Sequence, residues 1–573
     1  MNVQVLKGKG SSPGFALAPA YVLKNTNLQF SSEQIFDDLH EVKRWQQAHA
    51  QVILDLTELQ KKYSQKGPRE SAEIAEAHLM MAQDPEWISN IEGFMGLKHQ
   101  CEYSVDKASE DFAKMIESLD DPYLRQRAQD IRDVARRILR ALDEPQSNSH
   151  EQEKELKGDH ILVAEDLLPS ELLSLYSPQL KGLVLQKGNP TSHTTILART
   201  FEIPTILTVN GVMEKVRAHD EIAVSGMSGI VTINPDSHEK KNIQEKIQNE
   251  LFEKEELKNY ISQKSITRDG VRIEVASNLN SSLDLNFALG KGTEGIGLFR
   301  TEFLLMDRSS APSEEEQYQV YRKVIESVSP HKAIIRTFDI GGDKQVDYLN
   351  LPKEENPFLG LRGIRYCLKN IELFRTQIRA LLRAAQHGNL GIMIPMVTKV
   401  EEVLEFKNLL QKFHSELTQE GKKLEKSPET GIMIEVPSVA MIIDQLATHL
   451  DFFSIGTNDL VQYLCAADRM NSNVADLHDA YHPAVLRTLK LISDGVKNTS
   501  CWLGMCGEMA AKYDYQPLLL ALGFKELSVS PGAVLRTRKQ ILSLDMDSCH
   551  KVLQKALLAD SSESLKAVLS QPH

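Results

Sequence analysis

The last three hundred residues of the chain repeat one pattern, a short apolar run followed by a longer helix-forming stretch. We count eight such runs, at residues 272–279, 295–299, 333–338, 391–396, 431–436, 452–456, 502–505 and 526–530. Each run has the length of a buried strand, and eight strand–helix units in about 300 residues are what a (β/α)8 barrel requires. We therefore expect a C-terminal (β/α)8 TIM barrel over residues 265–573, with a doubly wound open sheet as the alternative.

The part of the chain before the barrel changes character several times. Residues 1–30 are apolar and rich in turns, residues 31–146 contain almost only amphipathic helix-forming segments, and residues 147–236 return to alternating strands and helices. We interpret the helical block as an all-α bundle inserted into one α/β domain, which residues 1–30 and 147–236 form together. A charge-dense helical segment, 237–264, then connects this domain to the barrel, and the polar stretch 145–158 is expected to be a flexible junction.

Length and composition exclude several classes of protein. The 573 residues carry a net charge of −13 and are 41% apolar, which is ordinary for a globular chain of three to four domains. This charge argues against a general nucleic-acid binder. No apolar run approaches the length of a membrane span, and the N-terminus lacks the apolar core of a signal peptide. Six cysteines without a CxxC pair predict reduced thiols and a cytoplasmic location.

Charged and polar residues stand where several of the eight predicted strands end. They are Arg300, Arg336, Glu435, Asn458, Asp459 and Cys506, with Arg469 ten residues beyond Asp459. One such residue is usually a salt-bridge partner, but in a barrel all the strand ends share one rim, where active sites lie. Arginine suits phosphate and carboxylate groups, and two carboxylates with ligand oxygens suit Mg²⁺. The set therefore predicts a site for a phosphorylated ligand that binds together with a divalent cation.

A second notable segment, residues 188–199, contains His193. A glycine-bearing turn after a predicted strand opens a helix there, and three threonines and a serine surround the histidine. Helix N-termini present free N–H groups that favour anions, so a phosphoryl group on His193 would be stabilised. On these residues alone, a helix cap is the alternative interpretation.

Several of these segments resemble the phosphoenolpyruvate-utilising enzymes. Thr191-Ser192-His193 resembles the phosphohistidine motif of that family, and segments 295–307, 336–344, 354–360, 454–460 and 504–508 resemble its barrel. Within the family the resemblance is to the Enzyme I branch of the bacterial phosphotransferase systems, and it extends over nearly the whole chain. It implies an α/β phosphohistidine swivelling domain, an inserted helical docking domain and a phosphoenolpyruvate-binding barrel.

The resemblance also implies a role for each candidate residue. His193 would be the nucleophile that takes the phosphoryl group, and Cys506 would protonate the enolate that remains. Substrate binding would fall to Arg300, Arg336, Asn458, Asp459 and Arg469, and Mg²⁺ binding to Glu435 and Asp459. The acceptor would be HPr, the histidine-containing phosphocarrier protein, docked on the helical block, and the barrel would carry a homodimer interface.

Two other functions stay open at this stage. A dikinase or phosphoenolpyruvate synthase of the same superfamily would need an ATP-grasp domain of several hundred residues, and only about 115 helical residues stand in that place. A regulatory relative that docks partners without turnover is the second. The chain departs from the family pattern at Asn189, at Pro190 and at Leu168, where the family carries a threonine, and the departures at Leu168 and Pro190 support this alternative.

Overall fold

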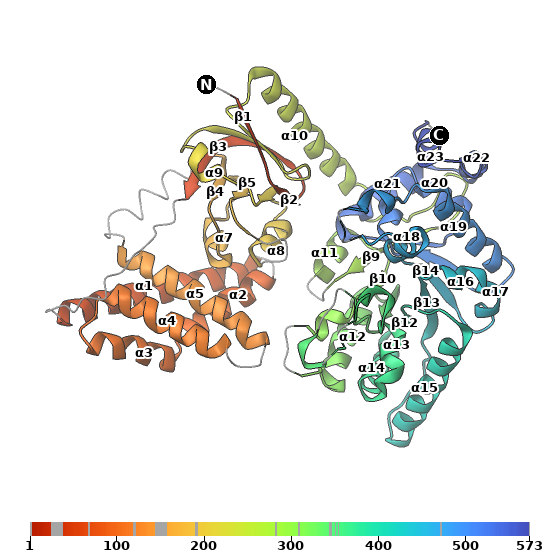
Figure 1. The fold of residues 1–573 in the computed structure, drawn as a ribbon, viewed down its shortest axis with the longest axis horizontal. Coiled ribbons are helices and arrows are strands. Elements are labelled where there is room, and N and C mark those ends of the chain that lie inside the picture. The colour runs from red at the N-terminus through yellow and green to blue at the C-terminus, as the bar shows by residue number, and fades with distance from the viewer. Residues whose placement is uncertain are drawn as a thin grey trace. The chain divides into compact units, whose positions relative to one another are not determined.

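The computed structural model describes residues 3–23, 38–66, 69–117, 122–143, 158–188, 193–280, 284–306, 310–342, 346–349, 351–352, 354–469, 471 and 473–571. The chain divides into two compact units, Met1–Glu255 and Glu256–His573 (Figure 1). Each is described by itself. The four domain boundaries expected from the sequence stay predictions, and most of the expected junction at 145–158 lies outside the described residues.

The first unit contains an eight-stranded sheet in the order β1-β8-β7-β3-β4-β5-β6-β2. Its strands are β1 (Gln4–Lys7), β2 (Lys9–Ser12), β3 (Phe15–Leu23), β4 (His160–Ala164), β5 (Leu180–Leu185), β6 (Thr205–Leu207), β7 (Glu221–Ser225) and β8 (Ile230–Ile233). Strands β3 to β6 run parallel, and the outer strands pair antiparallel. The helices of this domain are α7 (Pro169–Leu175), α8 (His193–Thr200) and α9 (Val212–Lys215), and α10 (Ser237–Lys258) follows β8 and runs across the boundary of the two units.

The helical block is an insertion between two neighbouring strands of this sheet. Ala20 on β3 lies opposite Ile161 on β4, although α1 (Asp38–Lys66), α2 (Arg69–Ala82), α3 (Pro85–Gly96), α4 (Cys101–Glu117) and α5 (Pro122–Asp143) separate them in the chain. Trp45 and Trp87 are among the buried side chains around which these helices pack. The Tyr63 hydroxyl at the end of α1 donates to the Leu173 carbonyl on α7 at 2.6 Å, which ties the bundle to the α/β domain. The predicted inserted bundle is therefore confirmed.

The second unit is a closed barrel of eight parallel strands, as the apolar rhythm predicts, so the open-sheet alternative is wrong. The strands are β9 (Glu274–Leu279), β10 (Ile296–Phe299), β11 (Lys332–Arg336), β12 (Asn389–Ile394), β13 (Glu429–Ile434), β14 (Phe452–Ile455), β15 (Trp502–Met505) and β16 (Glu526–Val529). β16 closes the ring onto β9, with Glu526 opposite Glu274.

Helices surround this barrel (Figure 1); those before β16 connect consecutive strands, and the last three follow β16. They are α11 (Asp284–Gly290), α12 (Glu314–Val328), α13 (Ile364–Lys369), α14 (Ile371–Ala384), α15 (Val400–Gln419), α16 (Pro437–Met441), α17 (Ile443–Leu446), α18 (Thr457–Cys465), α19 (Pro483–Val496), α20 (Gln516–Ala521), α21 (Val534–Ser543), α22 (Met546–Ala556) and α23 (Ser562–Leu569). A reciprocal cap starts α12, because the Ser313 amide donates to the Glu316 carboxylate at 2.7 Å and the Glu316 amide to the Ser313 hydroxyl at 3.3 Å.

The interior of the barrel is filled with side chains from several strands. Leu298, Ile334, Met393, Met433 and Phe452 form one buried cluster, and Cys506 lies against it at the end of β15. A packed interior leaves the loops that follow the strands as the place for chemistry.

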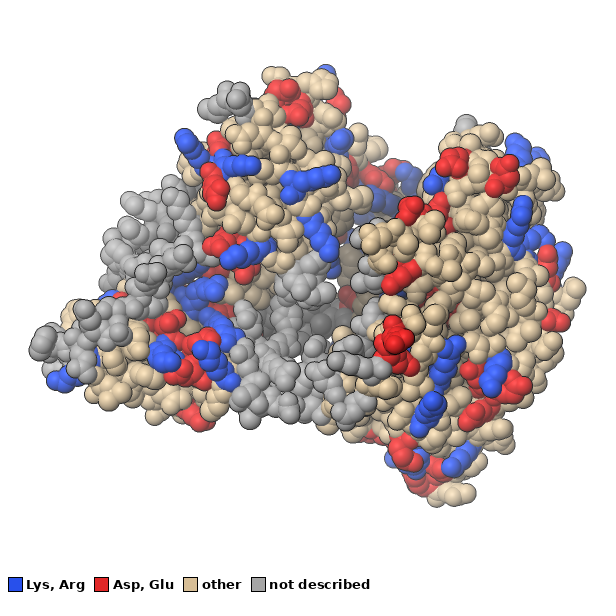
Figure 2. All heavy atoms as spheres, viewed as in Figure 1, with Lys and Arg blue, Asp and Glu red and all other residues tan. Residues whose placement is uncertain are grey.

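The described surface carries charges of both signs. On the face shown in Figure 2, the Lys and Arg side chains of the described residues are interspersed with Asp and Glu rather than joined into one basic face. Among the described residues, we find no helix with both the length and the apolarity that a membrane span requires.

Candidate active site

The barrel brings the sequence-predicted residues to one rim. Arg300 directly follows β10, Arg336 is the last residue of β11, Glu435 follows β13 and Cys506 follows β15. Asn458 and Asp459 lie in the first turn of α18, directly after β14, and Arg469 follows that helix. All eight strands are parallel, so these positions share the C-terminal end of the barrel.

Arg336 is held by two carboxylates that the sequence reasoning assigned no role. Its Nη2 donates to Glu302 Oε1 at 2.9 Å, and its Nη1 lies 3.1 Å from Asp339 Oδ2. Burial by itself would lower the pKa of this guanidinium, but the charges of Glu302 and Asp339 outweigh it, and the pKa rises. The buried Nε has no partner among the described residues. One N–H of Arg336 is therefore available for an anionic ligand.

Arg362, in the loop after β11, is the principal residue that the sequence reasoning missed. The side chain is 1% exposed and joins two carboxylates. Its Nε and Nη2 donate to the two oxygens of Asp339 at 2.9 and 3.0 Å, and its Nη1 and Nη2 donate to those of Asp459 at 3.2 and 3.0 Å. The family-like segment 354–360 lies in the same loop. Arg362 was not predicted because it lies 26 residues beyond the end of β11, and the sequence reasoning considered residues at strand ends.

Glu435 carries the feature that best fits a cation. Its Oε1 accepts the Met396 amide at 2.6 Å, while its buried Oε2 has no partner among the described residues. Burial, followed by the negative charges of Asp339 and Asp459, raises the pKa of Glu435 to about 8. A divalent cation shared with Asp459 would satisfy the orphaned oxygen and offset the charge that raises this pKa.

Cys506 is a buried thiol next to the arginines. Burial raises its pKa to about 11, although the charges of Arg300 and Arg336 act in the opposite direction. The Sγ lies 3.6 Å from the Ile455 carbonyl, which can accept the S–H. The group therefore carries its proton at neutral pH and can donate it to a reacting atom at this rim.

The remaining predicted residues border this cluster. The Arg300 Nη1 donates to the Asn280 side-chain carbonyl, and burial, followed by the charge of Arg336, lowers the pKa of Arg300. Arg469 Nη1 lies 3.7 Å from Asp459 Oδ1, and Asn458 Nδ2 donates to Glu508 Oε1 at 3.4 Å.

The candidate nucleophile belongs to the first unit. His193 begins α8, as the sequence predicts, but its side chain and Asn189, Pro190, Thr191 and Ser192 lie outside what the structure describes. The neighbouring Thr194 is buried, and its Oγ1 donates to the Leu167 carbonyl at 2.7 Å. Leu168 is buried at the start of α7 and offers no hydroxyl. The Thr194 hydroxyl therefore links the start of α8 to the segment before α7.

The helix α7 is in turn tied to the helical block. The Ser170 amide donates to Asp133 Oδ2 at 3.3 Å, and Arg137 Nη2 donates to the Ser170 carbonyl at 3.1 Å. Asp133 also lies 3.9 Å from Nε2 of the buried His78. Burial lowers the pKa of His78, but the hydrogen bond that its ring donates to Asp130 and the charge of Asp133 outweigh it and raise the pKa. The start of α7, next to the Leu167 carbonyl that accepts from Thr194 of α8, is thus held by Asp133 and Arg137 of α5.

Two other features do not have the chemistry of this rim. Glu41, Cys101 and Glu102 are grouped closely enough to hold a metal, but the Arg44 guanidinium donates to both carboxylates and already occupies the cluster.

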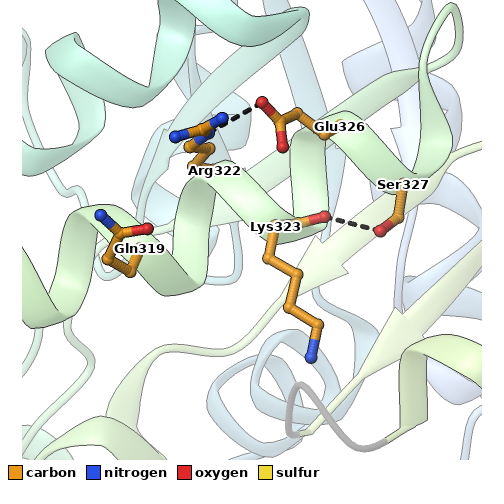
Figure 3. A pocket seen from close by; sticks show the side chains of 5 residues that line it. All are labelled: Gln319, Arg322, Lys323, Glu326 and Ser327. Atoms are coloured by element: carbon orange, nitrogen blue, oxygen red, sulfur yellow. Dashed lines mark hydrogen bonds and ion pairs between the residues drawn. The ribbon is translucent and has the colours of Figure 1, made fainter.

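A pocket of about 340 Å³ lies along α12, lined by Gln319, Arg322, Lys323, Glu326 and Ser327 (Figure 3). Arg322 is paired there with Glu326 at 2.8 Å, and no strand end contributes to it. The candidate active site is therefore the barrel rim.

Comparison with known proteins shows the family of this chain. Three family models match the chain: the N-terminal domain of PEP-utilising enzymes over residues 7–127, the mobile domain over 156–229 and the PEP-binding domain over 254–546. A phosphoenolpyruvate-protein phosphotransferase of Listeria innocua is 40% identical over 566 residues, which is 98% of both chains. One of Staphylococcus carnosus is 39% identical and covers 98% of this chain and 97% of its own.

A solved structure described as the NMR solution structure of Enzyme I (nEIt) is 32% identical and covers 43% of this chain and 98% of its own. Its TM-score of 0.38 is too low to carry an argument. The identities over the full length, together with the three family models, decide the assignment. The chain belongs to the PEP-utilising enzymes and, within them, to the phosphoenolpyruvate-protein phosphotransferases.

Proposed function

We propose that this enzyme transfers the phosphoryl group of phosphoenolpyruvate to its own His193 and then to a histidine of HPr, and that it releases pyruvate. This would be the first step of sugar uptake or regulation by a bacterial phosphotransferase system. The observation that carries the proposal is the buried cluster at the barrel rim, where arginines, four carboxylates and a protonated thiol meet.

The arginines supply the charge that an anionic substrate needs. Arg300, Arg336 and Arg469 bind the phosphate and carboxylate of phosphoenolpyruvate, with Asn458 and Asp459 beside them, while Arg362 holds Asp339 and Asp459 in place. The free Nε of Arg336 supports the assignment, since a buried N–H without a partner costs free energy until a ligand oxygen accepts it.

Glu435 and Asp459 would hold the divalent metal that we propose to be Mg²⁺. The orphaned Oε2 of Glu435 fits a cation of this kind, and oxygen ligands are those that Mg²⁺ prefers. A bound Mg²⁺ supplies positive charge against the phosphate of the substrate.

The chemistry needs one acceptor and one proton. The P–O bond of phosphoenolpyruvate breaks, a P–N bond to a ring nitrogen of His193 forms, and the electron pair of the broken bond remains on the enolate of pyruvate. The thiol of Cys506 then gives its proton to the enolate carbon, and the charges of Arg300 and Arg336 stabilise the thiolate.

The helical block, predicted as residues 31–146, would dock HPr. Its described residues include exposed apolar side chains, among them Leu54, Met80, Leu97 and Met115, which a docked protein would cover. The phosphohistidine domain, predicted as 1–30 and 147–236, would carry the phosphoryl group to it, with 237–264 as the linker.

We infer that the barrel, predicted as 265–573, forms a homodimer and that the protein works in the cytoplasm. Exposed apolar side chains in the segments after four of its strands, namely Leu359, Met441, Leu477 and Tyr513, support a contact surface on the barrel. All six cysteines are free, which suits a reducing compartment.

Pyruvate release and acid-labile phosphate, measured with phosphoenolpyruvate, Mg²⁺ and HPr, test the proposal. We expect both, and we expect the phosphate to move to HPr. A regulatory relative without turnover, the alternative supported by the departures at Leu168 and Pro190, would bind its partners and release no pyruvate.

A further inference from the structure

Asn278, on the strand β9, is a polar side chain that the assignment of the active site leaves without a role. The backbone pairing of β15 with β16 ends at Met505 and Leu527, so Cys506 and Ser528 are the next two residues along these strands. Asn278 Nδ2 donates to the carbonyls of both, at 2.9 Å for Cys506 and 3.2 Å for Ser528. One amide group therefore bridges the ends of two other strands, and one of its acceptors belongs to the residue that carries the thiol.

The Asn278 side chain is itself held in place. The Ser528 hydroxyl donates to Asn278 Oδ1 at 2.7 Å, so both ends of the side-chain amide have partners and its orientation is fixed. An amide held in this way is a rigid support. An apolar side chain of similar size would leave the Cys506 carbonyl without this donor.

The chain around Cys506 is held on its other side by β14. The amides of Cys506 and Gly507 both donate to the Ile455 carbonyl, at 3.1 and 3.2 Å. A side chain at Gly507 would not fit, because its Cβ would lie 1.9 Å from Thr457 Oγ1. Ile455 thus holds the two amides of this segment, and Asn278 holds the carbonyl between them. Together these contacts fix the backbone from which the Cys506 thiol projects.

We propose that Asn278 is a positioning residue for proton transfer, which aims the Cys506 thiol at one face of the enolate by holding the Cys506 carbonyl. This inference rests on the proposed function, because it takes Cys506 as the proton donor. In this step the S–H bond breaks, a C–H bond forms at the enolate carbon, and the electron pair stays on the sulfur. A small displacement of the thiol therefore slows this step, while the groups that bind phosphoenolpyruvate keep their places.

The variant Asn278→Leu tests this role, since it keeps the approximate size of the side chain and removes its hydrogen bonds. Binding of phosphoenolpyruvate with Mg²⁺ is measured by calorimetry in the His193→Ala background, where no phosphoryl transfer is expected. The rate of pyruvate formation in the first turnover is measured in the chain that keeps His193. We expect the Kd to change less than about twofold and the rate to fall about 100-fold.

The configuration of the product separates positioning from general damage to the barrel. Phosphoenolpyruvate with tritium at one vinyl position gives, in D₂O, a pyruvate whose methyl group holds H, D and T and is therefore chiral. A thiol fixed on one face of the enolate gives one configuration, whereas protonation of released enolate by water gives both. We expect one configuration from the natural chain and a mixture from Asn278→Leu, because a misaimed thiol cannot compete with water.

Asn370→Leu is the matched control, because Asn370 Nδ2 donates to the Tyr366 carbonyl at 3.0 Å where α13 meets α14. We expect its rate, Kd and product configuration to match those of the natural chain. Ser528→Ala removes the bond that fixes the amide of Asn278 and is the milder variant. We expect the same changes in it at a smaller size, and it decides the test if Asn278→Leu does not fold.

An unchanged rate, a single retained configuration, or a rise in Kd as large as the loss of rate overturns the inference while the proposed function stands. If the natural chain releases no pyruvate, the proposed function fails and the inference falls with it.

Discussion

Arg362 offers the sharpest test of how the rim of the barrel is held together. It is the buried cation that joins Asp339 and Asp459 through four hydrogen bonds of 2.9 to 3.2 Å. The variant Arg362→Leu keeps an apolar stem but leaves these carboxylates close to Glu435, whose pKa is already raised to about 8 by burial and by their charges. Removing one partner of a buried ion pair costs about 3–5 kcal/mol, and we expect a loss of this size from the stability of the barrel unit.

Urea unfolding of the full-length protein measures this loss. The chain has three tryptophans, of which Trp502 lies in the barrel, so the background Trp45→Phe with Trp87→Phe makes fluorescence report that unit. Arg375→Leu is the control, because Arg375 and its partner Glu416 are 37% and 26% exposed, and such pairs contribute at most about 1 kcal/mol. A loss below about 1 kcal/mol in Arg362→Leu would show that the two carboxylates do not depend on this guanidinium.

Three further predictions concern catalysis, pH and motion. Cys506→Ala should still bind phosphoenolpyruvate with Mg²⁺ and lose pyruvate formation, whereas Arg336→Ala should lose about 2–4 kcal/mol of binding; equal binding losses in calorimetry would contradict this division. Burial, followed by the charge of Glu274, raises the pKa of Glu526 to about 8 from its usual 4.5. The folded protein therefore favours the protonated carboxyl, and this contribution to stability is fully present below pH 4.5. The stability of the folded protein then falls as pH rises toward 8. Relative to Glu526→Gln, we expect the unfolding free energy to fall by about 1.4 kcal/mol per pH unit in that window, and parallel pH profiles of the two proteins would refute it. His193 must meet both the barrel and HPr, so fluorescent labels on the α/β domain and the barrel should change their distance distribution on adding phosphoenolpyruvate or HPr; an unchanged distribution would contradict a swivelling domain.

The fold of this protein is largely predictable from its sequence because the barrel strands are buried on both faces. Such strands appear in the sequence as continuous apolar runs, and the residues at their C-terminal ends lie at the rim of the barrel. Arg300, Glu435 and Cys506 could be predicted as site residues because they stand at these ends. The inserted bundle was predictable for a similar reason, since its helices keep one apolar stripe over several turns.

The polar partners at the rim were not predictable in the same way. Glu302 and Asp339 lie two to three residues beyond a candidate arginine, and Arg362 lies in a long loop, so no periodic pattern marks them. Their pairing becomes visible only when the loops meet in space. The anchoring of α7 on Asp133 escaped prediction too, because it joins segments from two different domains of the chain.

The central claim is that His193 accepts the phosphoryl group of phosphoenolpyruvate, and intact mass spectrometry tests it most directly. The protein is treated with phosphoenolpyruvate and Mg²⁺, and its mass is measured beside that of His193→Ala. Our account predicts a gain of one acid-labile phosphoryl group in the natural chain and none in the variant, with the variant still folded. A phosphoryl group on His193→Ala, or none on the natural chain, would contradict the account.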